Sequence, residues 1–156
     1  MTRVWAKRGS RPRAPRDRRY KWACLFGAAC PERRVAAAVV VPKANAGAMN
    51  EHLIAISEQI APDAHAALIM DKAGYHVAGE LNFPENITPI LLPPYSPELN
   101  SMENVWEYVR ANKLAITVFD DYDAIVDKTC EAWMFFADDK ERIHSITSRE
   151  WAKVSL

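Results

Sequence analysis

Cysteine is scarce in this chain of 156 residues, and its distribution excludes two kinds of stabilised small protein. Cys24, Cys30 and Cys130 are odd in number, and no two of them form a C-x-x-C motif. The sequence therefore indicates neither a disulfide framework nor a zinc site. A reducing cytoplasm is the compartment that fits this cysteine usage best.

Long apolar runs are also lacking. The longest uninterrupted aliphatic run covers residues 35–41, which is far shorter than a membrane-spanning helix. The apolar stretch at residues 22–30 has the wrong shape for a signal peptide, because a long lead-in of basic residues and prolines precedes it. We therefore expect a soluble intracellular protein with no membrane partner.

A net charge of either sign is absent as well, because 20 Lys and Arg residues balance 20 Asp and Glu residues. The balance hides an asymmetry: residues 1–34 hold 11 basic side chains against two acidic ones, and the remaining residues hold 9 basic and 18 acidic side chains. A basic arm on an acidic body favours a polyanionic partner, although charge alone is equally compatible with a solvated loop. We define the arm as residues 1–19, and its candidate DNA-binding residues are Arg3, Lys7, Arg8, Arg11, Arg13, Arg16, Arg18 and Arg19.

Four apolar segments predict β-strands. Residues 20–29 and 34–41 flank a short turn and predict an antiparallel hairpin. Residues 66–70 (A-A-L-I-M) are wholly apolar, as expected for a strand inside a sheet that is covered on both faces. Residues 87–92 contain Pro89, which cannot donate to a β-ladder and so favours a sheet edge. We expect all four strands to lie in one sheet.

Helical periodicity separates and follows these strands. Apolar residues recur at helical spacing from Met49 to Ile60, which predicts a helix that ends before Pro62. Further helices are expected over residues 101–113 and 121–136. Strands that alternate with helices indicate an α/β protein with a mixed sheet.

Asp71 follows the apolar strand at residues 66–70 directly. In α/β sheets, ligands and catalytic groups gather outside the carboxyl ends of strands, so this acid stands where a metal ligand is expected. The ordinary alternative is that Asp71 ends the strand and stabilises the next turn. His76, five residues on, is open to the same choice between a site residue and a packing residue.

Glu103 also has an ordinary alternative. If Asn100 were a helix N-cap, Glu103 would stand at the third helical position and complete a capping box, which stabilises a helix without catalysis. The two interpretations are compatible, because a helix start aims this side chain in a fixed direction.

The run L-L-P-P-Y-S-P-E-L-N-S-M-E-N-V-W at residues 91–106 resembles the signature around the last acid of mariner-type DDE transposases, in their bacterial insertion-sequence branch. The segment D-K-A-G-Y-H at residues 71–76 is similar to the family's pattern around its middle acid. The basic opening V-W-A-K-R-G-S-R-P-R-A-P is similar to the stretch that follows the family's first acid. The resemblance covers nearly the whole chain.

This resemblance implies a ribonuclease-H-like fold, a mixed sheet flanked by helices, in which residues 20–156 form the catalytic domain. It implies that Asp71 and Glu103 are catalytic metal ligands, with His76 and Asn100 as second-layer contacts. The implied cofactor is Mg²⁺, with Mn²⁺ as a substitute, and two ions are expected in a complete site. The implied partners are DNA, both transposon ends and target, and a second copy of the protein, with no small-molecule substrate. The implied location is the nucleoid of the bacterial cytoplasm.

Two departures from the family pattern bear on activity. Lys72 replaces a neutral residue after the middle acid, and its charge opposes a cation nearby. The family's first acid lies on a strand ahead of the basic segment, and no equivalent is present here, because Asp17 lies in the Arg/Pro-rich arm. We therefore expect an N-terminally truncated domain that lacks its first strand and is inactive alone. Two alternatives stay open: a non-catalytic regulatory remnant and an unrelated two-metal nuclease.

Overall fold

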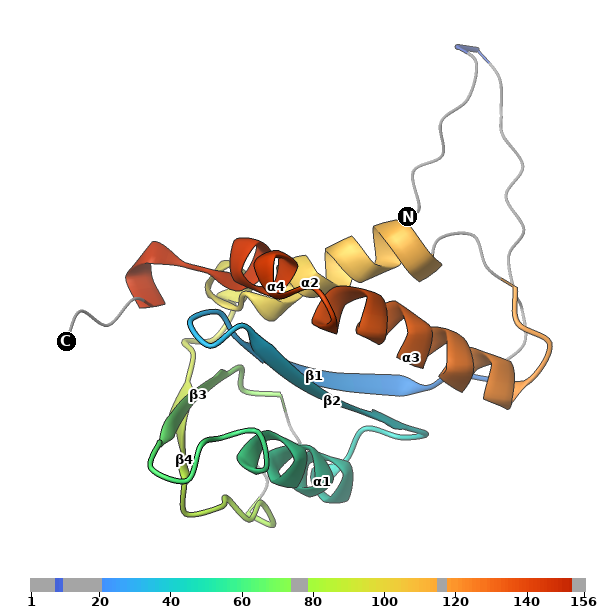
Figure 1. Cartoon of the computed structure of the whole chain (residues 1–156). Coiled ribbons are helices and arrows are strands. Elements are labelled where there is room, and N and C mark those ends of the chain that lie inside the picture. The colour runs from blue at the N-terminus through green and yellow to red at the C-terminus, as the bar shows by residue number, and fades with distance from the viewer. Residues whose placement is uncertain (1–7, 10–20, 74–78, 115–117, 153–156) are drawn as a thin grey trace.

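The computed structural model describes residues 8–9, 21–73, 79–114 and 118–152 (Figure 1). A β-hairpin forms the centre of the molecule. Its strands β1 (Cys24–Cys30) and β2 (Val35–Val41) pair antiparallel along their whole length, which confirms the predicted hairpin. The turn between them contains Arg34 in a left-handed conformation with φ of 55°.

The hairpin is covered on both faces, which explains why nearly every residue in it is apolar. Alternate side chains of a strand point to opposite faces of its sheet. Helix α1 (Ala46–Ser57) lies against one face (Figure 1). The other face is covered by α2 (Met102–Val109), α3 (Tyr122–Ala137) and α4 (Lys140–Thr147). The residues facing α1 are Phe26, Ala28, Ala37, Val39 and Val41, and those facing the other helices are Leu25, Ala29, Ala36 and Ala38.

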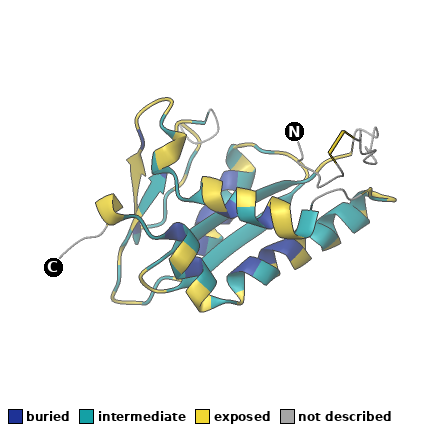
Figure 2. Cartoon of the chain, turned by 90° about the horizontal axis from the view of Figure 1, so that it is seen from above, coloured by how far each residue is buried: buried dark blue, intermediate teal, exposed yellow. Residues whose placement is uncertain are grey.

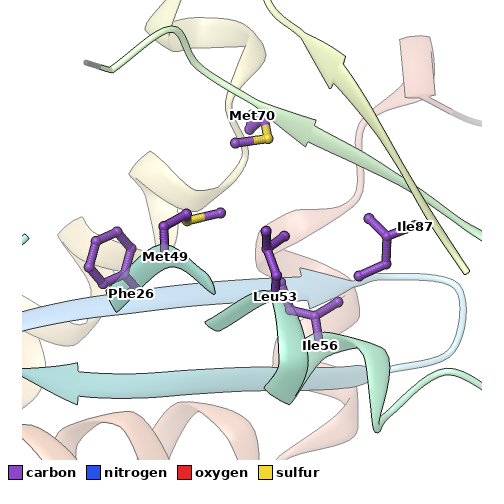
Figure 3. Packing of buried hydrophobic residues seen from close by; sticks show 6 residues of the cluster. All are labelled: Phe26, Met49, Leu53, Ile56, Met70 and Ile87. Atoms are coloured by element: carbon purple, nitrogen blue, oxygen red, sulfur yellow. The ribbon is translucent and has the colours of Figure 1, made fainter. Parts of the chain in front are cut away.

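Helix α1 begins at a side-chain cap, because the Asn45 Oδ1 atom accepts a hydrogen bond of 2.8 Å from the Ala48 N–H. The predicted apolar stripe is confirmed, since Met49, Leu53 and Ile56 are buried. They pack between Phe26 of the hairpin and the second strand pair (Figure 3). Ile60 lies beyond the helix but still packs against this cluster.

The second strand pair consists of β3 (Ala66–Met70) and β4 (Ile87–Leu91), which run parallel. Their ladder explains how Pro89 is accommodated. The Ala66 N–H donates to the Asn86 carbonyl, and the Leu92 N–H donates to the Met70 carbonyl. Because alternate residues of a parallel strand turn their backbone groups the same way, Pro89 points its donor-free nitrogen away from β3.

The prediction of a single four-stranded sheet is wrong for the part of the chain that is described. Two separate two-stranded sheets are present, β1–β2 and β3–β4. The prediction that residues 66–70 form an inner strand is also wrong, because β3 has one described neighbour. The hairpin and the β3–β4 pair cross rather than continue one another (Figure 1), and a cavity separates β1 from β3. No described strand bridges that gap.

The helical layer over the hairpin contains α2 (Met102–Val109), α3 (Tyr122–Ala137) and α4 (Lys140–Thr147). Helix α2 continues as a π-helical turn, Arg110–Leu114, and short 3₁₀ turns cover Pro97–Leu99 and Glu150–Ala152. Buried and exposed residues alternate along these helices (Figure 2). No helix in the described ranges is both long and apolar enough to cross a membrane.

Candidate functional site

Asp71 lies at the carboxyl end of β3, as the sequence predicted. Its side chain is exposed, and its Oδ1 atom accepts a hydrogen bond of 3.0 Å from the Ala73 N–H. The ordinary role of a strand-ending aspartate, stabilising the turn that follows, is therefore present. A carboxylate has two oxygens and about four lone-pair directions, so a turn-stabilising hydrogen bond does not by itself exclude a role in binding a cation.

The connection from β4 to α2 brings the second acid back toward Asp71. The carboxyl ends of parallel strands lie at one edge of a sheet, so the connection starts beside the end of β3. The Leu92 N–H bonds to the carbonyl of Met70, the residue before Asp71, at 2.9 Å, and the Leu92 side chain is buried. Tyr95 follows in a left-handed conformation with φ of 58° and is fully exposed.

Glu103 stands at the second position of α2, because the helix begins at Met102. The capping-box interpretation is wrong in its details. The Asn100 N–H donates to the Pro97 carbonyl, so it is already used, and the Asn100 Oδ1 atom accepts from the Met102 N–H at 3.1 Å. Asn100 therefore caps the start of the helix alone. The exposed Glu103 carboxylate has no side-chain hydrogen bond to a described residue.

Asp71, Asn100 and Glu103 line one cavity of about 540 Å³. Its walls come from the β1–β2 hairpin and its turn, β3, α1, the start of α2, and the C-terminal residues Thr147, Arg149, Trp151 and Ala152. The shared cavity is the arrangement that a joint role for the two acids requires. Carboxylate oxygens are the ligands that hard divalent cations prefer, so both acids are of the chemical type that such a role needs.

The described residues do not group enough ligands for a multi-carboxylate metal centre. Among them, no three His, Cys, Asp or Glu side chains are grouped so that they could hold one ion. Asp71 and Glu103 are hard oxygen donors and fit Mg²⁺ or Mn²⁺ by type, but they are two rather than three. His76 and seven of the eight predicted arm residues lie outside the described residues; Arg8 is described and exposed.

Two histidines that the sequence did not single out also line this cavity. His52 is buried on α1, where its ring lies 5.9 Å from that of Phe26. The His65 Nε2 atom lies 2.8 Å from the Thr88 hydroxyl, which ties the start of β3 to β4. The position of His52 three residues after Met49 placed it on the apolar face of its helix, but no sequence pattern marked His65.

Comparison with known proteins identifies relatives of the chain. Residues 1–126 match the family model described as DDE superfamily endonuclease. The chain is 48% identical over 131 residues to the uncharacterized protein y4pE/y4sA of Sinorhizobium fredii (strain NBRC 101917 / NGR234). That match covers 84% of this chain and 97% of the relative. No solved structure matches the chain significantly. Since the family match extends over most of its length, the chain belongs to the DDE superfamily endonucleases.

Proposed function

We propose that this chain is the catalytic-domain portion of a mariner-like bacterial transposase with a ribonuclease-H-like fold. Its reaction is Mg²⁺-dependent hydrolysis of a DNA phosphodiester, followed by attack of the freed 3′-hydroxyl on target DNA. The observation that carries the proposal is the placement of Asp71 and Glu103 around one cavity, in a chain that belongs to an endonuclease family. The family membership also argues against the alternative of an unrelated nuclease.

Each residue has a defined task in this proposal. Asp71 and Glu103 hold divalent cations through their carboxylate oxygens. Asn100 keeps the start of α2 in place through its bond to the Met102 N–H and so fixes the direction of Glu103. Divalent ions held by these two carboxylates would supply activation of the attacking oxygen and stabilisation of the leaving oxygen in an in-line displacement. The basic arm, residues 1–19, binds DNA phosphates without reading sequence.

The proposal includes an incomplete site. The family pattern has a third acid at the end of a preceding strand. The acids that line the cavity are Glu32, Asp71 and Glu103, and no three metal-ligating side chains among the described residues are grouped closely enough to hold one ion. We therefore propose that the 156-residue chain binds Mg²⁺ weakly and cleaves DNA at no more than trace levels. A longer polypeptide that adds an apolar strand ending in Asp is expected to show metal-dependent nicking.

A second candidate function is favoured by this same incompleteness. A chain with a basic arm and an incomplete metal site is suited to binding DNA, or an intact transposase, without cutting DNA. Such a regulatory remnant would bind DNA in a salt-sensitive manner in the absence of Mg²⁺. It would not nick DNA even in a longer polypeptide that adds the apolar strand ending in Asp.

Nicking of supercoiled plasmid with Mg²⁺, compared with EDTA, tests the proposed function. In the longer polypeptide, Asp71→Asn and Glu103→Gln should each abolish nicking while DNA binding is retained, because the amides keep size but lose the charge that holds a cation. The matched controls Asp63→Asn and Glu107→Gln change exposed acids that do not line the cavity and should nick normally. Nicking that survives Asp71→Asn would contradict the assignment of that residue.

A further inference from the structure

Lys72 is an isolated positive charge in the part of the chain that carries both candidate acids. It is the only Lys or Arg among residues 44–109, and these residues contain nine Asp and Glu side chains, Asp71 and Glu103 among them. The same residues include α1, β3, β4 and α2. A segment with this charge repels the phosphates of DNA, so DNA that is bound at the two acids needs a positive charge nearby.

The backbone holds Lys72 directly beside the first of these acids. The Met70 carbonyl at the end of β3 accepts a hydrogen bond of 2.9 Å from the Leu92 N–H. The Asp71 Oδ1 atom then accepts a hydrogen bond of 3.0 Å from the Ala73 N–H, and this bond spans Lys72. Because consecutive Cα atoms lie about 3.8 Å apart, the Lys72 ammonium stays close to any group that is bound at Asp71.

The side chain of Lys72 is not used for packing or for pairing with a described acid. It is exposed, and it makes no ion pair with an Asp or Glu side chain in the described ranges. Lys72 also does not line the cavity that Asp71 and Glu103 line. This placement argues against an ammonium that takes the position of a cation between the two acids. It leaves the Lys72 charge available to a partner outside the cavity.

We propose that Lys72 binds the DNA strand to be cut, through a phosphate next to the one that lies at Asp71 and Glu103. A lysine ammonium is a compact charge on a flexible four-carbon stem, which suits contact with a single phosphate oxygen. The contact releases the counterion of one phosphate and carries no sequence information. The proposal rests on the part of the proposed function that places DNA at the two acids.

DNA binding by the 156-residue chain in EDTA tests this contact, with a short fluorescent duplex as the probe. Lys72→Asn should reduce the steepness of log K against log salt concentration by about 0.9, which corresponds to about eightfold weaker binding at about 0.1 M salt. The affinities of the two proteins should converge near about 1 M salt, where release of a counterion no longer favours binding. Lys72→Arg keeps the charge and should keep the slope.

Lys140→Asn is the matched control, because Lys140 on α4 is also exposed and also makes no ion pair with a described acid. It should leave the slope unchanged. Thermal unfolding establishes that each variant is folded. Lysine acetylation followed by mass spectrometry then shows directly whether DNA covers Lys72. Saturating DNA should abolish most acetylation of Lys72 at low salt, whereas Lys140 should be acetylated at the same rate with and without DNA.

These measurements do not depend on nicking, because the 156-residue chain is studied in EDTA. Protection of Lys72 by DNA, together with absence of nicking by the longer polypeptide, would support the contact and contradict the proposed function. An unchanged slope in Lys72→Asn, or equal acetylation of Lys72 with and without DNA, would overturn the proposal. An equal loss of slope in Lys140→Asn would overturn it as well, because it would show a general effect of net charge.

Discussion

Single residues decide how closely the helical layer can approach the hairpin. Gly27 lies in the middle of β1, beneath the rings of Trp106 and Trp133, whose centroids are 6.1 Å apart. A Cβ atom at this position would lie 2.7 Å from Trp133 and 2.8 Å from Trp106. Gly27 is therefore required by close packing, and its backbone conformation is that of an ordinary strand.

Gly27→Ala should lower the free energy of unfolding by about 1–3 kcal/mol, because a methyl group forced into a packed layer displaces its neighbours. Urea unfolding followed by tryptophan fluorescence measures this change. Gly79→Ala is a suitable control, because an added Cβ atom at this position would meet no atom within 4 Å. An unchanged midpoint for Gly27→Ala would show that the two indole rings can move aside.

At the scale of elements, side-chain caps set where the helices begin. The Asp121 Oδ1 atom accepts from the Ala124 N–H at 2.8 Å at the start of α3, and the Asp139 Oδ1 atom accepts from the Arg142 N–H at 3.0 Å at the start of α4. These bonds satisfy amide donors that have no partner inside the helix.

Asp121→Ala should destabilise the protein by about 1 kcal/mol through loss of the α3 cap. Asp127→Ala, an exposed acid within the same helix, should change stability by less than about 0.5 kcal/mol. Thermal unfolding of the two variants separates the cap from a general effect of charge. Equal decreases in melting temperature for the two variants would show that the lost charge, and not the lost cap, causes the destabilisation.

The elements themselves were largely predictable from sequence, because strand and helix periodicities are local. The hairpin, α1, β3 and α3 were found close to their predicted bounds. Helix α4 was not predicted, since its eight residues contain little apolar periodicity and depend on the Asp139 cap and on burial of Ile143. Strand pairing was the part that failed. The apolar pattern of β3 correctly predicted a strand but wrongly predicted two neighbours for it. Strand pairing is a non-local property, and among the described residues β3 pairs with β4 alone.

For the candidate site as well, local features could be predicted from the sequence and the arrangement of hydrogen bonds could not. The positions of Asp71 and Glu103 at a strand end and a helix start followed from local sequence, and the shared cavity is consistent with that prediction. The distinction between a capping box and a lone Asn100 cap was not predictable. It depends on the 3₁₀ turn at Pro97–Leu99, whose Pro97 carbonyl takes the Asn100 N–H.

At the scale of the whole molecule, charge is divided between the arm and the body. Residues 1–34 hold 11 basic and two acidic side chains, whereas the remainder of the chain holds 9 basic and 18 acidic side chains. We predict that DNA binding is non-specific, with a slope of log K against log salt concentration near −5 for about six phosphate contacts. Deletion of residues 1–19 should flatten that slope, as measured by fluorescence anisotropy with duplex DNA. An unchanged slope would place the binding surface elsewhere on the protein.

The central claim is that Asp71 and Glu103 belong to one divalent-metal site. Iron-mediated cleavage of the backbone measures this most directly: Fe²⁺ replaces Mg²⁺, and with ascorbate and peroxide it produces radicals that cut the polypeptide near the bound ion. We predict two groups of cuts, one near Asp71 and one near Glu103, both suppressed by excess Mg²⁺. Both groups should disappear in Asp71→Asn and in Glu103→Gln and persist in Glu107→Gln. Cuts near one acid alone, or cuts at both that survive either substitution, would contradict a shared site.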